Sequence, residues 1–433
     1  MRDIFFLAFF LWTLPLALSS GLVAFLLWTW ADLVVINNYV YGFMSAIKYV
    51  QLYALVTFLV VLLQYHKKIS AYKLNAMIGL MLILLLHGAV SAVLAYPGLE
   101  RNWEIFGNLA KIIVMCALMP LVLKNRESIN LYVLCVVTAI GFHGLLDGLK
   151  MVASAGAHNV TGIGKFGDNN HYALILLMVM PLAIYLARYF ESLYLRWASF
   201  GLFMLMLLAV VGTNSRGALI AAMAGLLWFT LIGKKKIKLL LFGLSLCFVV
   251  FIAAPDDWFS RMSTIQEAQE DSSFMGRVAA WKLATAIAIE NPLFGGGFYA
   301  GQAASTFEVF RNSQGLLPFI ETPGLLRPTA THSIYFQILG DLGFNGLLLF
   351  VAIFGYVFHV RGEIAKRARE TGGIAWANDL ANLISVSIVV YLIGGALLSL
   401  AYYEIPYYLA ILIKLIDVVS QEEVKSVTIA LPK

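Results

Sequence analysis

The sequence predicts an all-α, polytopic membrane protein with about 12 transmembrane helices and one large, partly helical periplasmic loop. Hydrophobic residues fill 61% of the 433 positions and charged residues 12%, and the mean hydropathy is +0.84. A soluble domain of this length could not keep so much apolar surface away from water. Apolar runs also recur along almost the whole chain, and lysines and arginines cluster in alternate gaps between them.

The apolar runs set the positions of the expected helices. A bilayer with a hydrocarbon core of about 30 Å is crossed by about 20 helical residues. We expect spans near residues 40–63, 74–95, 106–123, 129–149, 169–188, 197–212, 216–232, 238–254, 334–360, 378–402 and 406–418.

The apolar start of the chain is more ambiguous. Arg2, an apolar run from Ile4 to Leu18 and the small residues that follow have the pattern of a secretory signal, but we expect an uncleaved anchor. Whether residues 21–36 cross the bilayer, re-enter it or lie flat stays open.

Orientation follows from the basic residues, which accumulate in short cytoplasmic loops. Five clusters fall at alternate loops: Lys67, Lys68 and Lys73; Lys124 and Arg126; Arg188 and Arg196; Lys234, Lys235, Lys236 and Lys238; and Arg361, Lys366, Arg367 and Arg369. With these inside, the outer loops are residues 96–105, 150–168, 213–216, 255–333 and 403–405. The C-terminal tail is then cytoplasmic, and so is the N-terminus if residues 4–36 make one net crossing.

Residues 255–333 are the one candidate for an extramembrane subdomain. They divide the chain into an N-terminal transmembrane bundle (1–254), a periplasmic loop subdomain (255–333) and C-terminal transmembrane helices with a tail (334–433). Inside the loop, spacings of three and four residues predict a helix from Phe274 to Glu290 that lies on the membrane or caps the spans. The glycines at 295–297 are a weak phosphate-loop signal, because no Lys-Ser/Thr pair follows them.

Charge and cysteine usage exclude several classes. The net charge is +6, but residues 255–333 hold five basic and eight acidic residues, so the surplus reflects topology and we expect no nucleic-acid partner. Cys116, Cys135 and Cys247 lie within apolar spans, where neither a disulfide framework nor a metal cluster is indicated. We therefore expect no metal and no cofactor.

Four polar sites that are far apart in sequence come to one face once the topology is assigned. Asp168 to His171 opens one span, Thr213 to Arg216 opens another, Arg277 begins the loop helix, and His332 opens a third span. Lys48, Lys111 and Asp147 also sit in or near apolar spans, where charge is usually paired or functional, but the sequence assigns them no role.

The arginines and histidines of these sites each have a structural alternative. Arg216 is either an interfacial arginine that reaches water or an anion-binding group at the entrance of a span. Arg277, expected in the first turn of the loop helix, either pairs with Glu270 or Asp271 or joins the helix amides in holding phosphate. His332 is either a capping residue or a general base, since its pKa lies near the working pH.

The remaining polar pair leaves the same choice open. Asp168 and His171 either extend the polar site or belong to a helix start, because Asp168 or Asn169 would serve as an N-cap.

The motifs of residues 168–355, in their order and spacing, resemble the O-antigen ligase family, which shares features with O-antigen polymerases and bacterial protein O-oligosaccharyltransferases. They are Asp168-Asn169-Asn170-His171, Asn214-Ser215-Arg216-Gly217-Ala218, Gly276-Arg277 with Trp281, Asn291-Pro292-Leu293-Phe294-Gly295 with Gly297-Phe298, and His332-Ser333 with Tyr335, Gln337 and Gly343.

This resemblance implies transfer of O-antigen polysaccharide from undecaprenyl diphosphate to a sugar hydroxyl of lipid A–core. The reaction would take place on the periplasmic side of a bacterial inner membrane, would invert the anomeric centre and would need neither nucleotide nor metal. His332 would be the general base, and Arg216 and Arg277 would bind the donor's diphosphate. The same cavity would include Asp168, Asn169, His171, Asn214, Ser215 and Arg327.

Three rival functions stay open. A polymerase would take a second lipid-linked glycan as acceptor and should have a second sizeable basic outer loop, whereas residues 150–168 are short. A protein O-oligosaccharyltransferase often has a second histidine soon after the first, but Ile334 and Tyr335 follow His332-Ser333 here. A secondary transporter predicts paired, interrupted helices and charge near the midplane, whereas these polar residues gather at the outer rim.

Overall fold

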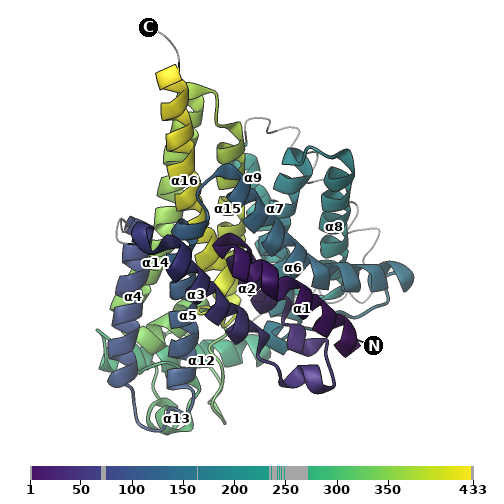
Figure 1. Cartoon of the computed structure of the whole chain (residues 1–433). Helices are drawn as coiled ribbons and strands as arrows, with labels where there is room; N and C mark the ends of the chain where they lie inside the picture. Colours follow the sequence, from purple (N-terminus) through teal and green to yellow (C-terminus); the bar gives the residue numbers. More distant parts are fainter. Residues whose placement is uncertain are drawn as a thin grey trace.

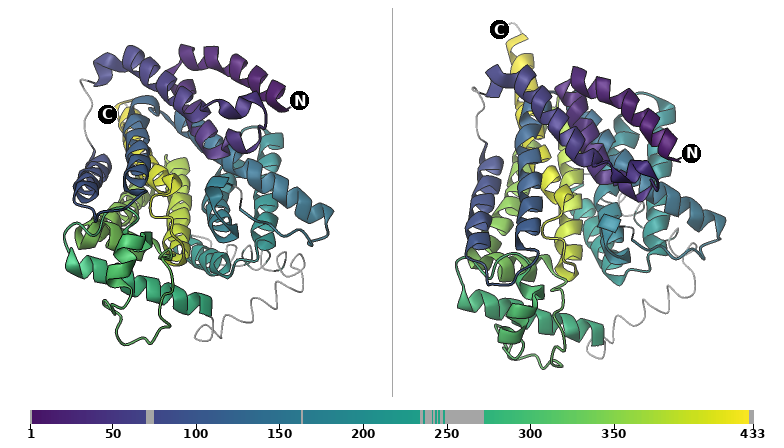
Figure 2. Two further views of the ribbon diagram at one scale, coloured as in Figure 1. Left: turned by 90° about the horizontal axis from the view of Figure 1, so that it is seen from below. Right: turned by 60° about the horizontal axis from the view of Figure 1, so that its bottom comes forward.

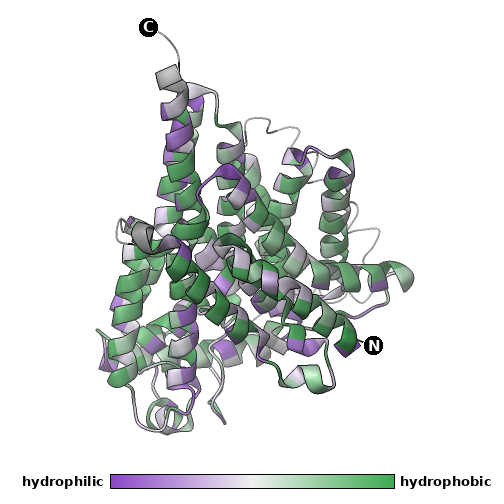
Figure 3. Ribbon diagram, in the orientation of Figure 1, coloured by the Kyte–Doolittle hydropathy of each residue, from purple (hydrophilic) through white to green (hydrophobic). Residues whose placement is uncertain are grey.

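The computed structural model describes residues 2–69, 75–162, 164–233 and 272–430, together with the single positions Lys236, Leu241, Gly243, Ser245 and Phe248. The described residues form α-helices and short 3-10 helices without a β-strand, as the sequence predicts (Figure 1). Hydrophobic residues cover most of the helices (Figure 3). The expected span at 238–254 lies outside the described residues except for four single positions.

Most helices follow the expected spans. The described helices are α1 Arg2–Ser19, α2 Gly21–Val34, η1 Ile36–Asn38, η2 Phe43–Ala46, α3 Tyr49–Ile69, α4 Ala76–Val93, α5 Asn102–Val122, α6 Arg126–Ala153, η3 Gly164–Phe166, α7 Asn169–Tyr189, α8 Leu193–Gly212, α9 Arg216–Ile232, α12 Ser272–Glu290, η5 Ala300–Gln302, α13 Ala304–Phe310, α14 Ile334–Thr371, α15 Ala375–Gly394, η6 Gly395–Leu397 and α16 Glu404–Ala430. However, α3 begins nine residues after the expected residue 40, and α15 ends eight residues before the expected residue 402.

Eight of the described helices are long and apolar enough to cross a membrane, namely α1, α4, α5, α6, α7, α8, α14 and α15, the last taken together with η6. Three shorter apolar helices cover Gly21–Val34, Tyr49–Tyr65 and Arg216–Ile232. The protein is therefore a multi-pass membrane protein. The total of about 12 spans and the side of the membrane on which each loop lies stay predictions.

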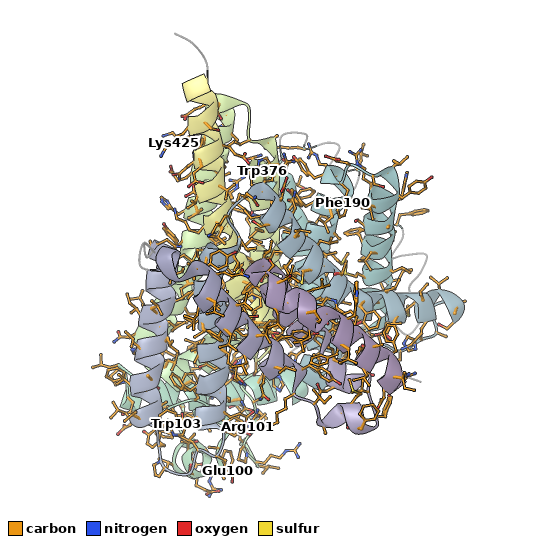
Figure 4. All side chains as sticks on the ribbon, viewed as in Figure 1. Glu100, Arg101, Trp103, Phe190, Trp376 and Lys425 are labelled. Atoms are coloured by element: carbon orange, nitrogen blue, oxygen red, sulfur yellow. The ribbon has the colours of Figure 1, made fainter. Side chains whose placement is uncertain are left out.

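Several basic loops meet at one end of the bundle, where α16 also ends; we call this the tail end. The guanidinium of Arg126 lies 5.4 Å from the ring centroid of Trp376 and 5.8 Å from that of Tyr189. The indole N–H of Trp376 donates to the Glu423 carboxylate of α16 (2.9 Å). Figure 4 labels Phe190, Trp376 and Lys425 there. Loops expected on one side of the membrane thus lie together.

The opposite end of the bundle, which we call the α12 end, is covered by α12, η5, α13 and residues 311–333 (Figure 2). The helix predicted for residues 274–290 is present as α12. It lies across the ends of the spans and shares a small core of its own with the segment that follows. That core consists of Leu283, Ala286, Ile287, Ala300, Phe307 and Phe310.

The N-terminal helices form a hairpin, which bears on the open topology of residues 4–36. The Asp3 carboxylate accepts hydrogen bonds from the backbone N–H groups of Tyr41 and Met44, so α1 begins where the loop after α2 lies. The Gln64 side chain accepts from the Gly21 N–H and donates to the Ser19 carbonyl. Thus α1 and α2 are antiparallel, and residues 4–36 do not make one net crossing. The start of α1 lies at the α12 end.

The glycines of residues 295–297 fill a break in α14 rather than form a phosphate loop. At Gly343 the backbone of α14 leaves the helical conformation (φ 71°). The N–H groups of Gly296 and Gly297 donate to the carbonyls of Gly340 and Asp341, and Phe344 N–H donates to the Pro292 carbonyl. The break therefore frees backbone groups that the protein itself satisfies, as helices inside a membrane require.

Helix α4 supplies further partners for the break. The Ser91 hydroxyl donates to the Asp341 carbonyl (2.9 Å), and the His87 Nε2 atom lies 2.9 Å from the Leu342 carbonyl oxygen. A Cβ atom at Gly295 or Gly343 would lie within 2.6 Å of backbone atoms of the other segment. Both glycines also have positive φ, which side chains disfavour. This close packing explains why glycines recur in both segments.

Candidate functional site

A cavity of about 1060 Å³ opens at the α12 end. Its described wall comes from α2, α3, α5, α7 and three non-adjacent segments, residues 299–302, 330–337 and 399–408. Charged and histidine side chains on this wall are Asp32, Lys48, Arg101, Lys111, His171, His332 and Glu404. Two of the predicted site residues, His171 and His332, thus face one cavity. Figure 4 shows Arg101 at this end of the molecule.

His332 is held in a backbone conformation that its side chain disfavours. Its φ is 45°, in the left-handed region, which costs a residue other than glycine about 1–3 kcal/mol. The neighbouring structure maintains it: His332 N–H donates to the Ser399 hydroxyl oxygen (2.9 Å), and the Trp281 indole N–H donates to the Thr331 carbonyl (2.7 Å). The Trp281 ring in turn stacks on Phe336. Such strained residues concentrate at functional sites.

The surroundings of His332 favour its neutral form. Burial lowers the pKa of its imidazole below the usual value, the positive charge of Arg277 and the nearby His171 lower it further, and Asp168 opposes them. A neutral imidazole can accept a proton. Arg277, His171 and Asp168 therefore each influence the pKa of His332 through their charge.

The starts of α7 and α9 are joined directly. The Asn169 amide donates to the Thr213 carbonyl (2.7 Å), and the Ser215 hydroxyl donates to the Asn170 side-chain oxygen (2.7 Å). Asp168 caps α7 by accepting from the N–H groups of Asn170 and His171, so the N-cap interpretation is confirmed. The fourth polar site, which ends in Arg216, therefore adjoins the segment that carries His171.

Asn214 and Ser215 shape the start of α9. Ser215 is its N-cap and accepts from the Ala218 N–H (3.2 Å). Asn214 has a φ of 53°, and its amide lies 3.4 Å from the Asn159 side-chain oxygen. These two residues thus position Arg216 as the first residue of α9. They are not part of the described cavity wall.

The arginines stand in a different relation to the cavity from His332. Neither Arg216 nor Arg277 belongs to its described wall, although both side chains are half-buried. Because α12 begins at Ser272, Arg277 is the sixth residue of the helix. The expectation of a first-turn position beside exposed amides is therefore wrong. Arg327 is exposed and also lies off the described wall, and Glu270 and Asp271 lie outside the described residues.

Asp147, one of the three charges without a role, belongs to a separate buried network. Its carboxylate accepts from Lys150 (2.8 Å) and from the Tyr172 hydroxyl (3.0 Å), and the His158 Nε2 atom lies 3.4 Å away. A charge within a span is usually paired in this way. Asp147 therefore stabilises the packing of α6 on α7 and does not face the cavity.

Sequence reasoning missed most of the charged wall. It noted Lys48 and Lys111 without a role, and it did not single out Arg101, Asp32 or Glu404. One usable signal was the place of Lys111 as the tenth of 21 residues in an apolar helix, since charge at such a depth marks function or pairing. Within the described residues, no group of three His, Cys, Asp or Glu side chains is arranged to hold a metal ion.

Comparisons with known proteins divide the chain into two matched segments. Residues 201–351 match the family model described as O-Antigen ligase, and residues 1–191 match a family of unknown function (DUF5935). No curated protein matches the chain. His332, Arg277 and Arg216 lie in the first of these segments, whereas Lys48, Arg101 and Lys111 lie in the second. The cavity wall is therefore assembled from both.

Proposed function

We propose that this chain, which belongs to the O-antigen ligase family through residues 201–351, ligates O-antigen polysaccharide from undecaprenyl diphosphate onto a sugar hydroxyl of lipid A–core. The family match supports a glycosyltransferase of the O-antigen ligase or polymerase type. The observation that carries the proposal is His332, which lines a large cavity on a strained backbone and whose pKa is lowered by burial and by the charge of Arg277.

In the proposed reaction His332 is the general base. It takes the proton of the acceptor hydroxyl as the oxygen forms a bond with the anomeric carbon of the donor sugar. The bond from that carbon to the diphosphate oxygen breaks on the opposite face, which inverts the anomeric configuration. Undecaprenyl diphosphate leaves with both electrons of that bond. Because diphosphate is already a good leaving group, the step needs neither nucleotide nor metal.

Arg277 and Arg216 would bind the diphosphate and stabilise the charge that develops on it. Support for Arg277 comes from the effect of its positive charge, which lowers the pKa of His332. Support for Arg216 comes from the hydrogen bond that joins the neighbouring residue Ser215 to α7. Loss of one such preorganised donor costs about 2.7–4 kcal/mol in the barrier. Arginine suits this role better than lysine because its planar guanidinium makes two parallel contacts.

The proposed location is the periplasmic face of a bacterial inner membrane. The α12 end, where the cavity opens, corresponds to the loops expected outside, and the tail end collects the basic loops expected in the cytoplasm. In this arrangement residues 1–254 form the N-terminal bundle, 255–333 the periplasmic subdomain and 334–433 the C-terminal helices. Membrane lipids surround the bundle, and the expected partners are the lipid-linked donor and lipid A–core.

An O-antigen polymerase is the main alternative within this family, because it uses the same donor chemistry with a second lipid-linked glycan. A protein O-oligosaccharyltransferase is a further one. A secondary transporter would have paired interrupted helices around its substrate. The break in α14 at Gly343 is instead filled by residues 292–297 and by α4, which favours a structural role for it.

The proposal is tested with the purified protein in detergent and chelator, supplied with undecaprenyl-diphosphate glycan and lipid A–core. Wild type should form ligated lipopolysaccharide, and His332→Ala and Arg216→Ala should fail. Arg311→Ala is the matched control, because Arg311 is exposed at the same end and pairs with Glu308. Extension of the donor glycan by wild type would reassign the protein as a polymerase. Ligation by His332→Ala would remove the proposed base.

A further inference from the structure

The cavity carries a second group of cations that the proposed chemistry does not use. Lys48 precedes α3, Arg101 precedes α5, and Lys111 lies within α5; all three line the cavity. These three cations outnumber the two carboxylates that line the cavity, Asp32 of α2 and Glu404 of α16. The cavity therefore has a positive wall formed by α3 and α5, which we call the α3–α5 wall.

Lys111 is the most informative of these residues. It is the tenth of 21 residues in a candidate span, and its ammonium donates to the Asn108 side chain (3.2 Å). Both residues face the cavity. A lysine at the middle of a span is costly, and such residues mark ligand or ion pathways. The Lys111 side chain is exposed, and an ammonium that faces a cavity beside a single amide is suited to an anionic ligand.

Arg101 has a different environment at the mouth of the cavity. It pairs with Glu104 (2.9 Å), and both side chains are about half exposed. Its guanidinium also lies 5.4 Å from the ring centroid of Tyr299. The carboxylate of Glu104 offsets part of the positive charge of Arg101. Lys48 and Lys111 are therefore the candidate anion-binding residues of this group.

The rest of the α3–α5 wall is apolar. Val50, Ala54 and Phe58 line it from α3 at intervals of four residues, which places them along one face of the helix. Val114 lines it from α5 and is also 36% exposed. The side chains that α3 and α5 add to this wall beside the cations are therefore mostly apolar. Cations beside an apolar surface match an amphiphile with an anionic headgroup.

The position of this wall separates it from the proposed donor site. Helices α3 and α5 pack against each other and against α2, whereas α9, which begins with Arg216, packs on α7 and α15, and α12, which carries Arg277, packs on α14. In an inverting displacement the attacking hydroxyl and the leaving diphosphate lie on opposite faces of the anomeric carbon. Two separate anion sites in one active centre therefore point to two substrates.

We propose that the α3–α5 wall is the acceptor site, in which Lys48 and Lys111 bind phosphate groups of the acceptor glycolipid while the apolar residues hold its lipid portion. This inference rests on the proposed function, because it assigns the donor diphosphate to the arginines. The acceptor is recruited sideways from the membrane and presents its hydroxyl to His332 across the cavity. Binding should weaken as salt screens the two lysines.

The test measures binding by native mass spectrometry of the full-length protein with lipid A–core and with the same glycolipid after removal of its phosphates. Wild type should bind the phosphorylated form at least about tenfold more tightly. Lys48→Gln/Lys111→Gln should lose that preference. Lys48→Arg/Lys111→Arg, which keeps both charges, and Arg311→Gln, an exposed control at the same end, should retain it.

Three binding outcomes would overturn the assignment. Equal binding of the two glycolipids by wild type would show that phosphate is not recognised. A preference that survives in the double glutamine variant would place the phosphate elsewhere. Displacement of the glycolipid by inorganic phosphate at an equal concentration would show a site for free anions.

Kinetics separate this inference from the proposed function. The double glutamine variant should raise KM for lipid A–core about tenfold and leave both KM for the donor and kcat at saturating acceptor unchanged. A rise in the donor KM instead would assign the wall to the donor and overturn the inference. If wild type ligates nothing yet shows the binding preference and the variant loses it, the phosphate site stands and the proposed function fails.

Discussion

The backbone N–H of His332 donates a hydrogen bond to the Ser399 hydroxyl oxygen, 2.9 Å away. This contact joins the segment that precedes α14 to the segment that follows η6, so the orientation of the imidazole depends on two parts of the chain that are distant in sequence. The hydrogen bond acts on the strained residue itself, because the φ of His332 is 45°.

Replacement of Ser399 should therefore slow the reaction. A hydrogen bond of this kind contributes about 0.5–1.5 kcal/mol, so we expect Ser399→Ala to lower kcat about two- to twelvefold. Ser399→Thr should restore the rate because it keeps the hydroxyl. Ser387→Ala serves as a control, since that hydroxyl donates within α15. An unchanged kcat in Ser399→Ala would contradict a positioning role.

The pH dependence of the reaction should report the charge of Arg277. Its positive charge helps to lower the pKa of His332, and the proposed base is active only when neutral. Activity should therefore fall as the pH drops through that lowered pKa. In Arg277→Gln the pKa should rise, so the acidic limb of kcat/KM should move to higher pH.

Arg277→Lys is the informative control for that shift. It keeps the positive charge but not the bidentate contact, so the rate should fall while the acidic limb stays in place. An acidic limb at the same pH in wild type and Arg277→Gln would show that Arg277 does not influence the proposed base.

The break in α14 should respond strongly to a single methyl group. In Gly343→Ala the Cβ atom would lie 2.6 Å from the Pro292 carbonyl oxygen at a φ of 71°, so we expect a fall in Tm. Gly355→Ala lies in the same helix with no atom within 4 Å of the added Cβ and should raise stability by about 0.5–1 kcal/mol. Thermal unfolding in detergent measures both; equal Tm values would contradict the packing described.

The hairpin of α1 and α2 predicts the side on which the N-terminus lies. Arg2 and Arg311 are exposed at the α12 end, and Lys425 is exposed at the tail end. In a background without Cys116, Cys135 and Cys247, Arg2→Cys and Arg311→Cys should react with a membrane-impermeant thiol reagent from the periplasmic side. Lys425→Cys should react only after the membrane is opened. If Arg2→Cys alone did not react with the reagent from the periplasmic side, residues 4–36 would make a single net crossing.

The Asp147 network should matter for stability. Asp147→Ala leaves the buried Tyr172 hydroxyl without its acceptor, which costs about 1–3 kcal/mol. Asp147→Asn keeps an acceptor oxygen and should recover much of that loss. The free energy of unfolding in detergent distinguishes them, and equal destabilisation by both variants would assign the effect to the ion pair with Lys150.

Local chemistry explains what could be predicted from the sequence alone. Helices in a membrane must satisfy their backbone groups internally, so apolar length identified most of the described helices. Side chains that cap helix starts are also local, and Asp168 is one of them. The alternation of topology with each span also predicted that the starts of α7 and α9 lie at one end, where Asn169 and Ser215 join them.

Only the tertiary structure decided which side chains share the cavity. An apolar helix offers similar hydrophobic surface all round, so its sequence does not state which face meets protein and which meets lipid. Lys111 could therefore be noted but not placed, and the break at Gly343 could not be matched with residues 292–297. The antiparallel packing of α1 on α2 depended in the same way on contacts such as Asp3 with Tyr41, which join residues far apart in the sequence.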